Sequence, residues 1–402
     1  MPLPPGFSPV DFPQFHRQLP ARLAAERGRL VARAATGLGS LALRVSDGAA
    51  YTYRPHAGGV EVIPGDDTAD TIVEMDLEAW QGLVHELEAP AGLLYAGRIR
   101  CRRGHAIELM AWESALRALY NGRPPYDPAN PGLRCRHGDA LDPHATFTLA
   151  SGREEMADFL GAAGYLFVRD VFRSSEVAAF VKEAHELQCE ARQGDKLSWW
   201  GKNAAGEAVV CRVTRGVAKP HLATLPADAR LLSLKDLAEP SFVYKRGEGQ
   251  GVTVIFKHPH MAEGLGDLPW HRDCGMGGHA VVCPVLVASV YLTAATPETG
   301  ELAMLPGSHR ASMNAHDQSS ELSAYAAHFH ALPGDVSLHF SDTVHVAPPP
   351  TDGQRDGYRI SAVVGFARPG ARHHRGESSY NDVLHQRDDG QIERLETVAN
   401  RV

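Results

Sequence analysis

The sequence predicts two domains, an α+β unit at the N-terminus and a β-rich domain of sandwich or jelly-roll type after it. Length is the first observation, because 402 residues exceed what one hydrophobic core usually organises. The second is a segment rich in Pro, Gly and Asp at residues 123–147, where no hydrophobic periodicity survives and a linker is expected. The third is a change beyond residue 250, where many short apolar strand patterns follow one another.

Composition places the chain among soluble globular proteins and excludes some partners. Hydrophobic residues make up 44% and charged residues 22% of the sequence. The formal net charge of −8 gives no electrostatic reason to expect nucleic acid. No apolar run approaches the roughly 20 residues of a membrane span, and the first residues lack the features of a signal peptide. The six cysteines are scattered without a CxxC pair, which suits a reducing compartment, so we expect a cytoplasmic protein.

Residues 20–122 combine helical and strand patterns. A helix-like run at 19–35 precedes half-buried strand patterns at 40–55 and 58–64. A strand, an amphipathic helix, a second strand and a last helix follow, and the Asn-Gly pair 121–122 is a typical end for that helix. Such an α+β unit could enclose an apolar pocket between its helices and its sheet.

This pattern resembles the sterol-carrier-protein-type lipid-binding domain. The stretch "DTADTIVEMDLEAWQGLV…LYAGRIRCRRGHAIEL" carries the resemblance, without a catalytic signature. The resemblance implies that the N-terminal domain binds lipids. The alternative is a small α+β domain that serves only packing or dimerisation.

The second domain, residues 148–368, is predicted to begin with a helix, a short strand and a helix that Ser174 or Ser175 caps. Turns such as "PETG" and "LPGD" then separate several strands. The strand patterns are "GVTVIFKH", "PVLVASVYLTAA", "ELAMLPGSH", "DVSLHF" and "RISAVVGFA". The polar tail, residues 369–402, is expected to be irregular.

The stretch "LPWHRDCGMGGH" concentrates possible metal ligands. In a strand, residues i and i+2 point to the same face, so His271 and Asp273 would place an imidazole beside a carboxylate. With one histidine from a distant strand, such a pair forms the 2-His-1-carboxylate triad of non-haem Fe(II) oxygenases. That triad leaves positions open for a bidentate co-substrate and for O2.

Other side chains of this stretch are weaker candidates. A zinc site made of Cys274, His279 and Cys283 would need a fourth ligand, and none is evident. Cys274 should face the opposite side of the strand, which favours buried packing. His279 lies beyond a glycine pair, where a loop position or a substrate contact is expected. A zinc hydrolase would need a His-Glu helix motif that the chain lacks.

A histidine and an arginine further along the chain complete the pattern. His345 follows one strand pattern and Arg359 begins the next. An anionic co-substrate with a distal carboxylate needs a bidentate cation, and arginine suits that geometry better than lysine. Arg355 is a rival for this role. Arg359 is preferred because it sits directly on the apolar strand "RISAVVGF", which can hold its side chain inside the barrel.

Residues 148–368 resemble the phytanoyl-CoA dioxygenase family of Fe(II)/2-oxoglutarate oxygenases. Four stretches carry the resemblance: "FLGAAGYLFVRDVF", "PWHRDC", "PETGELAMLPGSHR" and "GDVSLHFSDTVH…R". The resemblance implies a double-stranded β-helix, a jelly-roll or cupin-like core with flanking helices. It also implies that His271, Asp273 and His345 bind iron and that Arg359 binds the distal carboxylate of 2-oxoglutarate.

Two more residues match the family, and one interval departs from it. Lys257 matches a lysine that often precedes the His-x-Asp strand and could contact 2-oxoglutarate or the substrate; a solvated surface lysine is the alternative. His309, in "PGSH", matches a turn motif and is expected to form hydrogen bonds without binding metal. The interval between His345 and Arg359 is longer than usual, which is why Arg355 stays a rival.

These observations predict an oxygenase that couples decarboxylation of 2-oxoglutarate to succinate with oxidation of an unactivated C–H bond, using Fe(II), 2-oxoglutarate and O2. Related halogenases replace the carboxylate ligand by a small residue, whereas this chain keeps Asp273, so hydroxylation is expected; desaturation or ring closure would use the same ligands. The substrate is expected to be a small molecule or a lipid-like one. The alternative is a lipid- or acyl-binding carrier protein with a non-catalytic oxygenase-like domain. The sequence leaves the substrate and the oligomeric state open.

Overall fold

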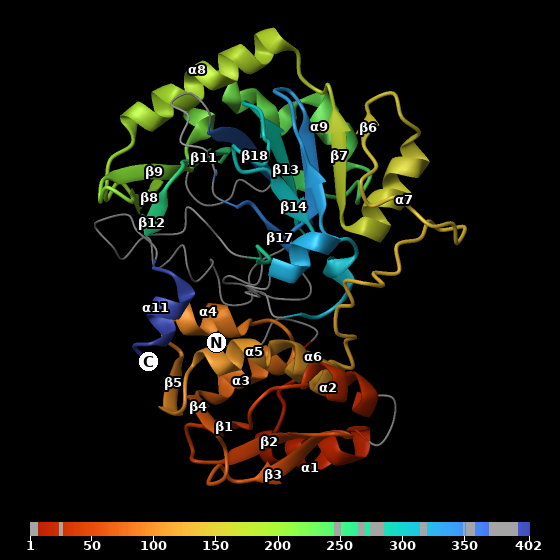
Figure 1. Cartoon of the computed structure of the whole chain (residues 1–402), viewed down its shortest axis with the longest axis vertical. Helices are drawn as coiled ribbons and strands as arrows, with labels where there is room; N and C mark the ends of the chain where they lie inside the picture. Colours follow the sequence, from red (N-terminus) through yellow and green to blue (C-terminus); the bar gives the residue numbers. More distant parts are fainter. Residues whose placement is uncertain are drawn as a thin grey trace.

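The chain forms a smaller N-terminal domain and a larger domain, stacked along the long axis of the molecule (Figure 1). Among the residues described, we find no helix with the length and apolarity that a membrane crossing requires. The computed structural model describes residues 7–23, 27–244, 251–263, 270–273, 285–313, 320–348, 350, 358–369 and 393–402.

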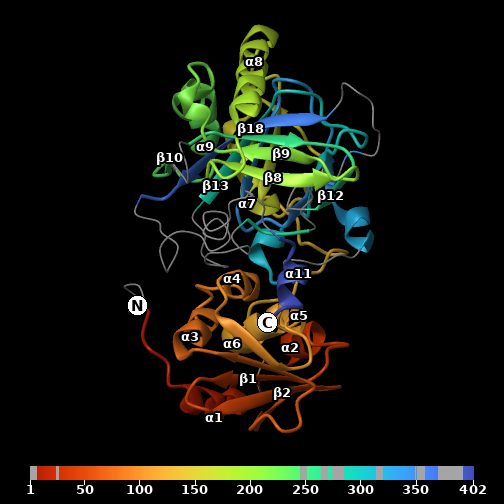
Figure 2. The same ribbon diagram turned by 90° about the vertical axis from the view of Figure 1, so that its left-hand side faces the viewer.

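The N-terminal domain is built on a five-stranded mixed sheet with the strand order β3-β2-β1-β4-β5. Strand β1 pairs antiparallel with β2 and parallel with β4. Helices α3 to α6 lie between this sheet and the larger domain (Figures 1 and 2). The elements are α1 (Phe12–Arg22), α2 (Gly28–Ala34), β1 (Leu41–Val45), β2 (Ala50–His56), β3 (Gly59–Pro64), β4 (Thr71–Met75), α3 (Leu77–Val84), α4 (Pro90–Tyr95), β5 (Ile99–Arg103), α5 (Ile107–Ala111) and α6 (Glu113–Asn121).

The helix expected at residues 19–35 differs in the structure. Helix α1 begins at Phe12, and α2 is a separate helix. The start of α1 is explained by Asp11, whose carboxylate accepts the N–H of Gln14 at 2.7 Å and caps the helix. The end of α6 agrees with the prediction, because Gly122 adopts the left-handed conformation (φ 70°) that terminates the helix.

Large aromatic side chains fill the space between the helices and the sheet of this domain. Trp80, Trp112 and Tyr53 are fully buried. The Tyr53 hydroxyl lies 2.6 Å from Nε2 of His16 and 2.6 Å from the hydroxyl of Tyr120, so these three buried polar groups satisfy one another.

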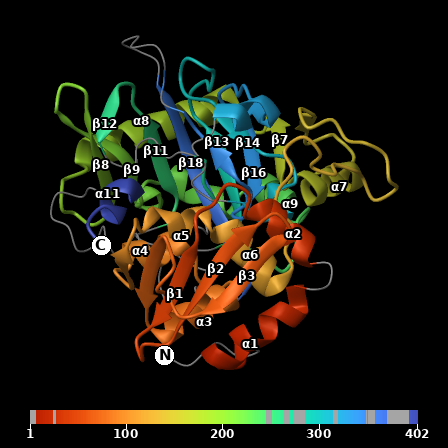
Figure 3. The same ribbon diagram turned by 60° about the horizontal axis from the view of Figure 1, so that its bottom comes forward.

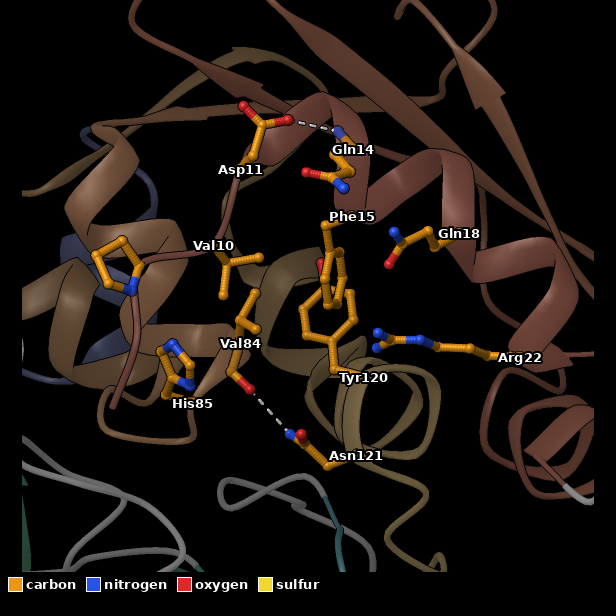
Figure 4. Close-up of a pocket in the computed structure, with 11 residues that line it drawn as sticks. Val10, Asp11, Gln14, Phe15, Gln18, Arg22, Val84, His85, Tyr120 and Asn121 are labelled. Atoms are coloured by element: carbon orange, nitrogen blue, oxygen red, sulfur yellow. Dashed lines mark hydrogen bonds between the residues drawn. The ribbon is translucent and has the colours of Figure 1, made fainter. Parts of the chain in front are cut away.

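A pocket of about 380 Å³ lies at the edge of the N-terminal domain, beside α1 (Figure 4). Phe15, Val84 and Tyr120 form its apolar part, and Gln18 and Arg22 are among the polar side chains at its border. This pocket is not the one that the sequence predicts, because it lies beside α1 and not between the helices and the sheet. The space between the helices and the sheet contains the buried rings of Trp80, Trp112 and Tyr53.

The larger domain is a jelly roll with flanking helices, as the sequence predicts. Its large sheet has the order β12-β8-β9-β11-β18-β13-β16-β7-β6, with β10 paired to β18, and its small sheet has the order β15-β14-β17. Helix α8 lies on the side of the large sheet that faces away from the N-terminal domain (Figures 1 and 2). The elements are β6 (Phe147–Thr148), α7 (Arg153–Ala163), β7 (Tyr165–Arg169), α8 (Ser174–Glu190), β8 (Ser198–Asn203), β9 (Ala208–Val213), α9 (Ala229–Lys235), β10 (Val243–Tyr244), β11 (Thr253–Lys257), β12 (Met261–Glu263), β13 (Val285–Tyr291), β14 (Leu302–Met304), β15 (Ala327–Phe329), β16 (Val336–Phe340), β17 (His345–Val346) and β18 (Arg359–Ala367).

The central strands of the large sheet separate an apolar face from a polar one. On β18, Ile360 and Ala362 belong to the main hydrophobic core, whereas Arg359 and Ser361 alternate with them and point to the opposite face. The register places Ser361 opposite Tyr291 on β13, so the second face carries polar groups on neighbouring strands. This second face lines the interior of the jelly roll.

Neither predicted serine caps helix α8. The helix begins at Ser174, but the carboxylate of Glu176 accepts the N–H of Arg173 at 2.8 Å and forms the cap. The same carboxylate forms an ion pair with Arg230, at 2.7 Å. The capping role expected of a serine therefore falls to a carboxylate, which also links α8 to Arg230 in α9.

The expectation of an irregular tail is wrong for the last part of the chain. Residues 393–402 contain helix α11 (Leu395–Ala399), whose Leu395 and Ala399 are buried in the core cluster of the N-terminal domain. The hydroxyl of Tyr95, on α4, donates to the carbonyl of Glu393 at 2.8 Å. Figure 3 shows α11 beside α4. Residues 370–392 of the tail lie outside the described residues.

Candidate metal centre

Three residues from two distant segments meet inside the jelly roll. The ligand atoms of His271, Asp273 and His345 all lie within 4.8 Å of one another. Nε2 of each histidine is 3.7 Å from Oδ1 of Asp273. Two imidazole nitrogens and one carboxylate oxygen grouped in this way could bind a single transition-metal ion.

Backbone pairing places the two histidines side by side. The N–H of His271 donates to the carbonyl of His345 at 3.1 Å, and the N–H of His345 donates to the carbonyl of His271 at 3.0 Å. Residues directly opposite in such an antiparallel bridge share a face, and the two ring centroids are 4.3 Å apart. Nδ1 of His345 lies 2.9 Å from the carbonyl of Thr343, so a proton on Nδ1 is donated there and Nε2 is left for a metal.

The surroundings hold the cluster in the protonation states that bind a cation. Burial, with His271 as the next cause, lowers the pKa of His345 to about 3. Burial acts to raise the pKa of Asp273, but His345 and His339 keep that pKa well below its usual range. Neutral imidazole and ionised carboxylate are the metal-binding forms of these groups. Although it lies deep in the protein, Asp273 keeps 38% of its side-chain surface accessible, so the cluster is open on its carboxylate side.

A further histidine, which the sequence reasoning missed, borders this cluster. Nε2 of His339 lies 3.3 Å from Oδ2 of Asp273, and its ring centroid is 4.6 Å from that of His345. The side chain is buried. The only sequence signal was the alternation of "VSLHF", which puts His339 on the same face of β16 as Ser337, toward the interior.

Arg359 and Lys257 are direct neighbours across β18 and β11. Arg359 is 5% exposed, and its Nε has no hydrogen-bond partner in the part of the chain that the structure describes. Burial lowers the pKa of Arg359, an effect that Tyr291 partly offsets. A buried guanidinium is unfavourable unless an anion binds it, so this side chain suits a carboxylate ligand. Lys257 is 4% exposed, and the alternative of a solvated surface lysine is therefore wrong.

The remaining candidates are His309 and four residues outside the described part of the chain. Nε2 of His309 lies 3.3 Å from the carbonyl of Gly161, and its ring stacks on Phe340, in agreement with the predicted hydrogen-bonding role. Three other candidates, Cys274, His279 and Cys283, lie outside the described residues, as does the rival arginine, Arg355.

Residues 161–357 match the family model described as phytanoyl-CoA dioxygenase. The matched segment contains all three residues of the cluster and ends just before Arg359. The larger domain is phytanoyl-CoA dioxygenase-like. Enzymes of this family use Fe(II), 2-oxoglutarate and O2, and these are the cofactors that the sequence predicts for the dioxygenase-like domain.

Solved structures similar to this chain include EctD from S. alaskensis with 2-oxoglutarate and 5-hydroxyectoine, at 22% identity and a TM-score of 0.46 over 60% of this chain and 84% of that one. A second is SnoK, a non-heme alpha-ketoglutarate-dependent carbocyclase from nogalamycin biosynthesis, at 20% identity and a TM-score of 0.45 over 62% of this chain and 96% of that one. A third is AviO1 from Streptomyces viridochromogenes Tue57, at 22% identity and a TM-score of 0.44 over 56% of this chain and 98% of that one. No curated protein matches the chain at a significant level.

Proposed function

We propose that the chain is an Fe(II)/2-oxoglutarate-dependent oxygenase that hydroxylates an unactivated C–H bond of a small-molecule substrate, with release of succinate and CO2. The observation that carries the proposal is the convergence of His271, Asp273 and His345 from two segments of a dioxygenase-like domain. The buried Arg359 in the same domain supports it.

In this proposal, Nε2 of His271, Nε2 of His345 and Oδ1 of Asp273 would hold the iron. Bound iron supplies the oxidising chemistry, with 2-oxoglutarate as co-substrate and O2 as oxidant. The low pKa values of Asp273 and His345 keep these groups ready to bind the metal at neutral pH. A carboxylate ligand at position 273 would leave no place for a halide, which argues against halogenation; among the remaining outcomes we propose hydroxylation.

Arg359 is proposed to bind the distal carboxylate of 2-oxoglutarate. A guanidinium presents paired N–H donors that match a carboxylate, and its buried Nε has no described protein partner. Lys257, the neighbour of Arg359 across the two strands, adds a second buried cationic side chain to the same face of the sheet. We propose that it contacts the co-substrate or the substrate.

The lipid-carrier alternative has less support. Trp80 and Trp112 are fully buried and help to fill the N-terminal interior, and the pocket beside α1 is bordered partly by polar side chains. The N-terminal domain therefore gives no reason to prefer a lipid-like substrate over a small polar one.

The test is succinate formation from 2-oxoglutarate with Fe(II), ascorbate and O2, measured with and without candidate substrates. We expect Asp273→Ala to reduce turnover and Fe(II) affinity by more than the roughly 10- to 100-fold that loss of a hydrogen-bond partner of a ligand costs. Asp158→Ala, at an exposed ion pair with Arg136, is the matched control and should behave as wild type. Wild-type turnover in Asp273→Ala would remove the assignment.

A further inference from the structure

One segment of the dioxygenase-like domain contacts both ligand-bearing strands and the N-terminal part of the molecule. We call this segment, residues 305–313, the brace segment. It follows β14 and includes the "PGSH" turn. Figure 1 places the region below β14 and β17 next to α6, at the junction of the two domains.

The brace segment is hydrogen-bonded to the neighbours of all three proposed ligands. Arg272 lies between the first two ligands in the sequence, and its Nη2 donates to the carbonyls of Ser308 at 3.1 Å and Ala311 at 2.6 Å. Val344 directly precedes the third ligand, and its N–H donates to Oγ of Ser308 at 2.9 Å. The N–H of Leu305 donates to the carbonyl of Val344, also at 2.9 Å.

On its other side, the brace segment is hydrogen-bonded to the linker and to α6. The carbonyl of Ser312 accepts the N–H of Tyr126 at 2.7 Å and the hydroxyl of Ser114, on α6, at 3.2 Å. The N–H of Ser312 donates to the carbonyl of Pro124 at 2.8 Å. The hydroxyl of Tyr126 donates to the carbonyl of Pro306 at 2.9 Å.

A small apolar cluster reinforces these hydrogen bonds. Tyr126, from the linker, packs in it together with Trp270, Leu305, Met313 and Val344. Trp270 and Val344 each directly precede one of the two histidines. The linker therefore contributes a side chain to the core that supports both histidine strands.

Arg272, the residue between two of the proposed ligands, is itself fully buried beneath this segment. On the side of the N-terminal domain, Glu113 and Arg117 form a buried ion pair on α6, the helix that also carries Ser114.

We propose that the N-terminal domain and the linker are a structural part of the metal centre. Ser114 and Tyr126 act as positioning residues: they bind the brace segment, and the brace segment binds the two segments that carry the ligands. This inference rests on the proposed function, because ligand placement matters for the reaction only if a metal binds. It gives the N-terminal domain a role that requires no lipid.

The test compares full-length variants in anaerobic Fe(II) binding with 2-oxoglutarate present. Tyr126→Phe removes one hydroxyl and keeps the packed ring, and it should raise the Fe(II) dissociation constant roughly threefold to tenfold, the loss expected for one hydrogen bond. The visible absorption band of the Fe(II)–2-oxoglutarate complex should shift or weaken. Ser114→Ala should act in the same direction, and Ser114→Thr, which keeps a hydroxyl, should restore binding.

Tyr95→Phe is the matched control, because it also removes a tyrosine hydroxyl that donates to a backbone carbonyl between chain segments. This contact involves α11 and not the brace segment, so Fe(II) binding should stay at the wild-type value. Circular dichroism checks folding, and the Ser114 variants carry the test if Tyr126→Phe does not fold. Unchanged affinity and absorption in Tyr126→Phe and Ser114→Ala, beside a wild type that binds iron, would overturn the inference and leave the proposed function standing. A wild type that binds neither Fe(II) nor 2-oxoglutarate would overturn both.

Discussion

At the scale of single residues, Asp273 uses its two carboxylate oxygens differently. Oδ1 lies 3.7 Å from Nε2 of each proposed histidine ligand, whereas Oδ2 lies 3.3 Å from Nε2 of His339. A carboxylate that receives a hydrogen bond on its outer oxygen presents a single oxygen to a metal and keeps its orientation when the metal leaves. We therefore propose that His339 positions Asp273 and does not itself bind the metal.

Replacing His339 tests whether the two carboxylate oxygens of Asp273 have these different roles. His339→Phe keeps a planar ring but removes the donor, and we expect the Fe(II) dissociation constant to rise about 10- to 100-fold. His339→Gln keeps an N–H donor and should recover most of the loss. Equilibrium dialysis of Fe(II) under anaerobic conditions measures both values. If His339→Phe binds iron as tightly as wild type, the hydrogen bond has no role in positioning Asp273.

The sequence predicted some of these residues and missed others for a physical reason. The His271–Asp273 pair was predictable because positions i and i+2 of an extended segment share a face. In the structure the segment is not a full strand: His271 forms an isolated bridge with His345, and Asp273 lies in a turn. The roles of His339 and Arg272 were not predictable, because their partners, an oxygen of Asp273 and two carbonyls of the brace segment, belong to segments far away in the chain. A single histidine or arginine in an apolar stretch of sequence does not indicate which distant residue it will contact.

At the scale of elements, helix α1 carries a buried imidazole whose protonation opposes folding. Nδ1 of His16 lies 2.7 Å from the carbonyl of Phe12, and Nε2 lies 2.6 Å from the hydroxyl of Tyr53. Burial lowers the pKa of His16 from 6.5 to about 4, although the Phe12 carbonyl acts in the opposite direction. Between these two pH values the unfolded chain binds a proton that the folded chain does not bind, so acid lowers stability in that window.

The free energy of unfolding of the N-terminal domain should therefore fall as the pH drops from about 6.5 to about 4. The slope contributed by His16 is at most roughly 1.4 kcal/mol per pH unit. His16→Gln, which does not titrate, should be less stable at pH 7 but should lose less stability on acidification. Urea unfolding of both proteins at several pH values measures the difference. Equal slopes in the two proteins would contradict this account.

Most elements were predictable from local patterns, whereas their ends often were not. Strand β18 coincides with the apolar run "RISAVVGFA", and Gly122 ends α6 as expected. The start of α8 depends on Glu176, a carboxylate that Arg230 also binds, so the cap is part of a tertiary contact. Helix α11 is short, and Leu395 and Ala399 are buried in the core of the N-terminal domain, where α4 lies beside the helix.

At the scale of the whole molecule, the two domains are connected at more than one place. The brace segment joins the linker and α6 to the ligand strands, and α11 returns to pack on the N-terminal domain. Both ends of the chain lie at the N-terminal domain (Figure 2). Binding of Fe(II) at the proposed site and formation of the contact between the domains should therefore be thermodynamically linked. A coupling free energy acts equally in both directions, so each event should stabilise the other.

Metal binding should accordingly slow amide hydrogen exchange at the domain junction. The N–H groups of Tyr126 and Ser312 form hydrogen bonds between the linker and the brace segment, and we expect them to exchange several-fold more slowly with Fe(II) and 2-oxoglutarate present. Hydrogen–deuterium exchange with mass spectrometry measures this effect. The β2–β3 hairpin, residues 50–64, should not respond, and Asp273→Ala should show no protection at the junction. Identical exchange with and without metal in wild type would contradict the linkage.

The sequence by itself determined the jelly-roll strands, the position of the His-x-Asp pair and the presence of a separate N-terminal unit, because alternation and turn residues act over short distances along the chain. The tertiary structure alone decided that His339 contacts the carboxylate of that pair, and that Tyr126 and Ser114 bind the segment beside the centre. These contacts join segments that are far apart in the sequence, so they depend on how the two sheets and the two domains pack. Local periodicity carries no information about that packing.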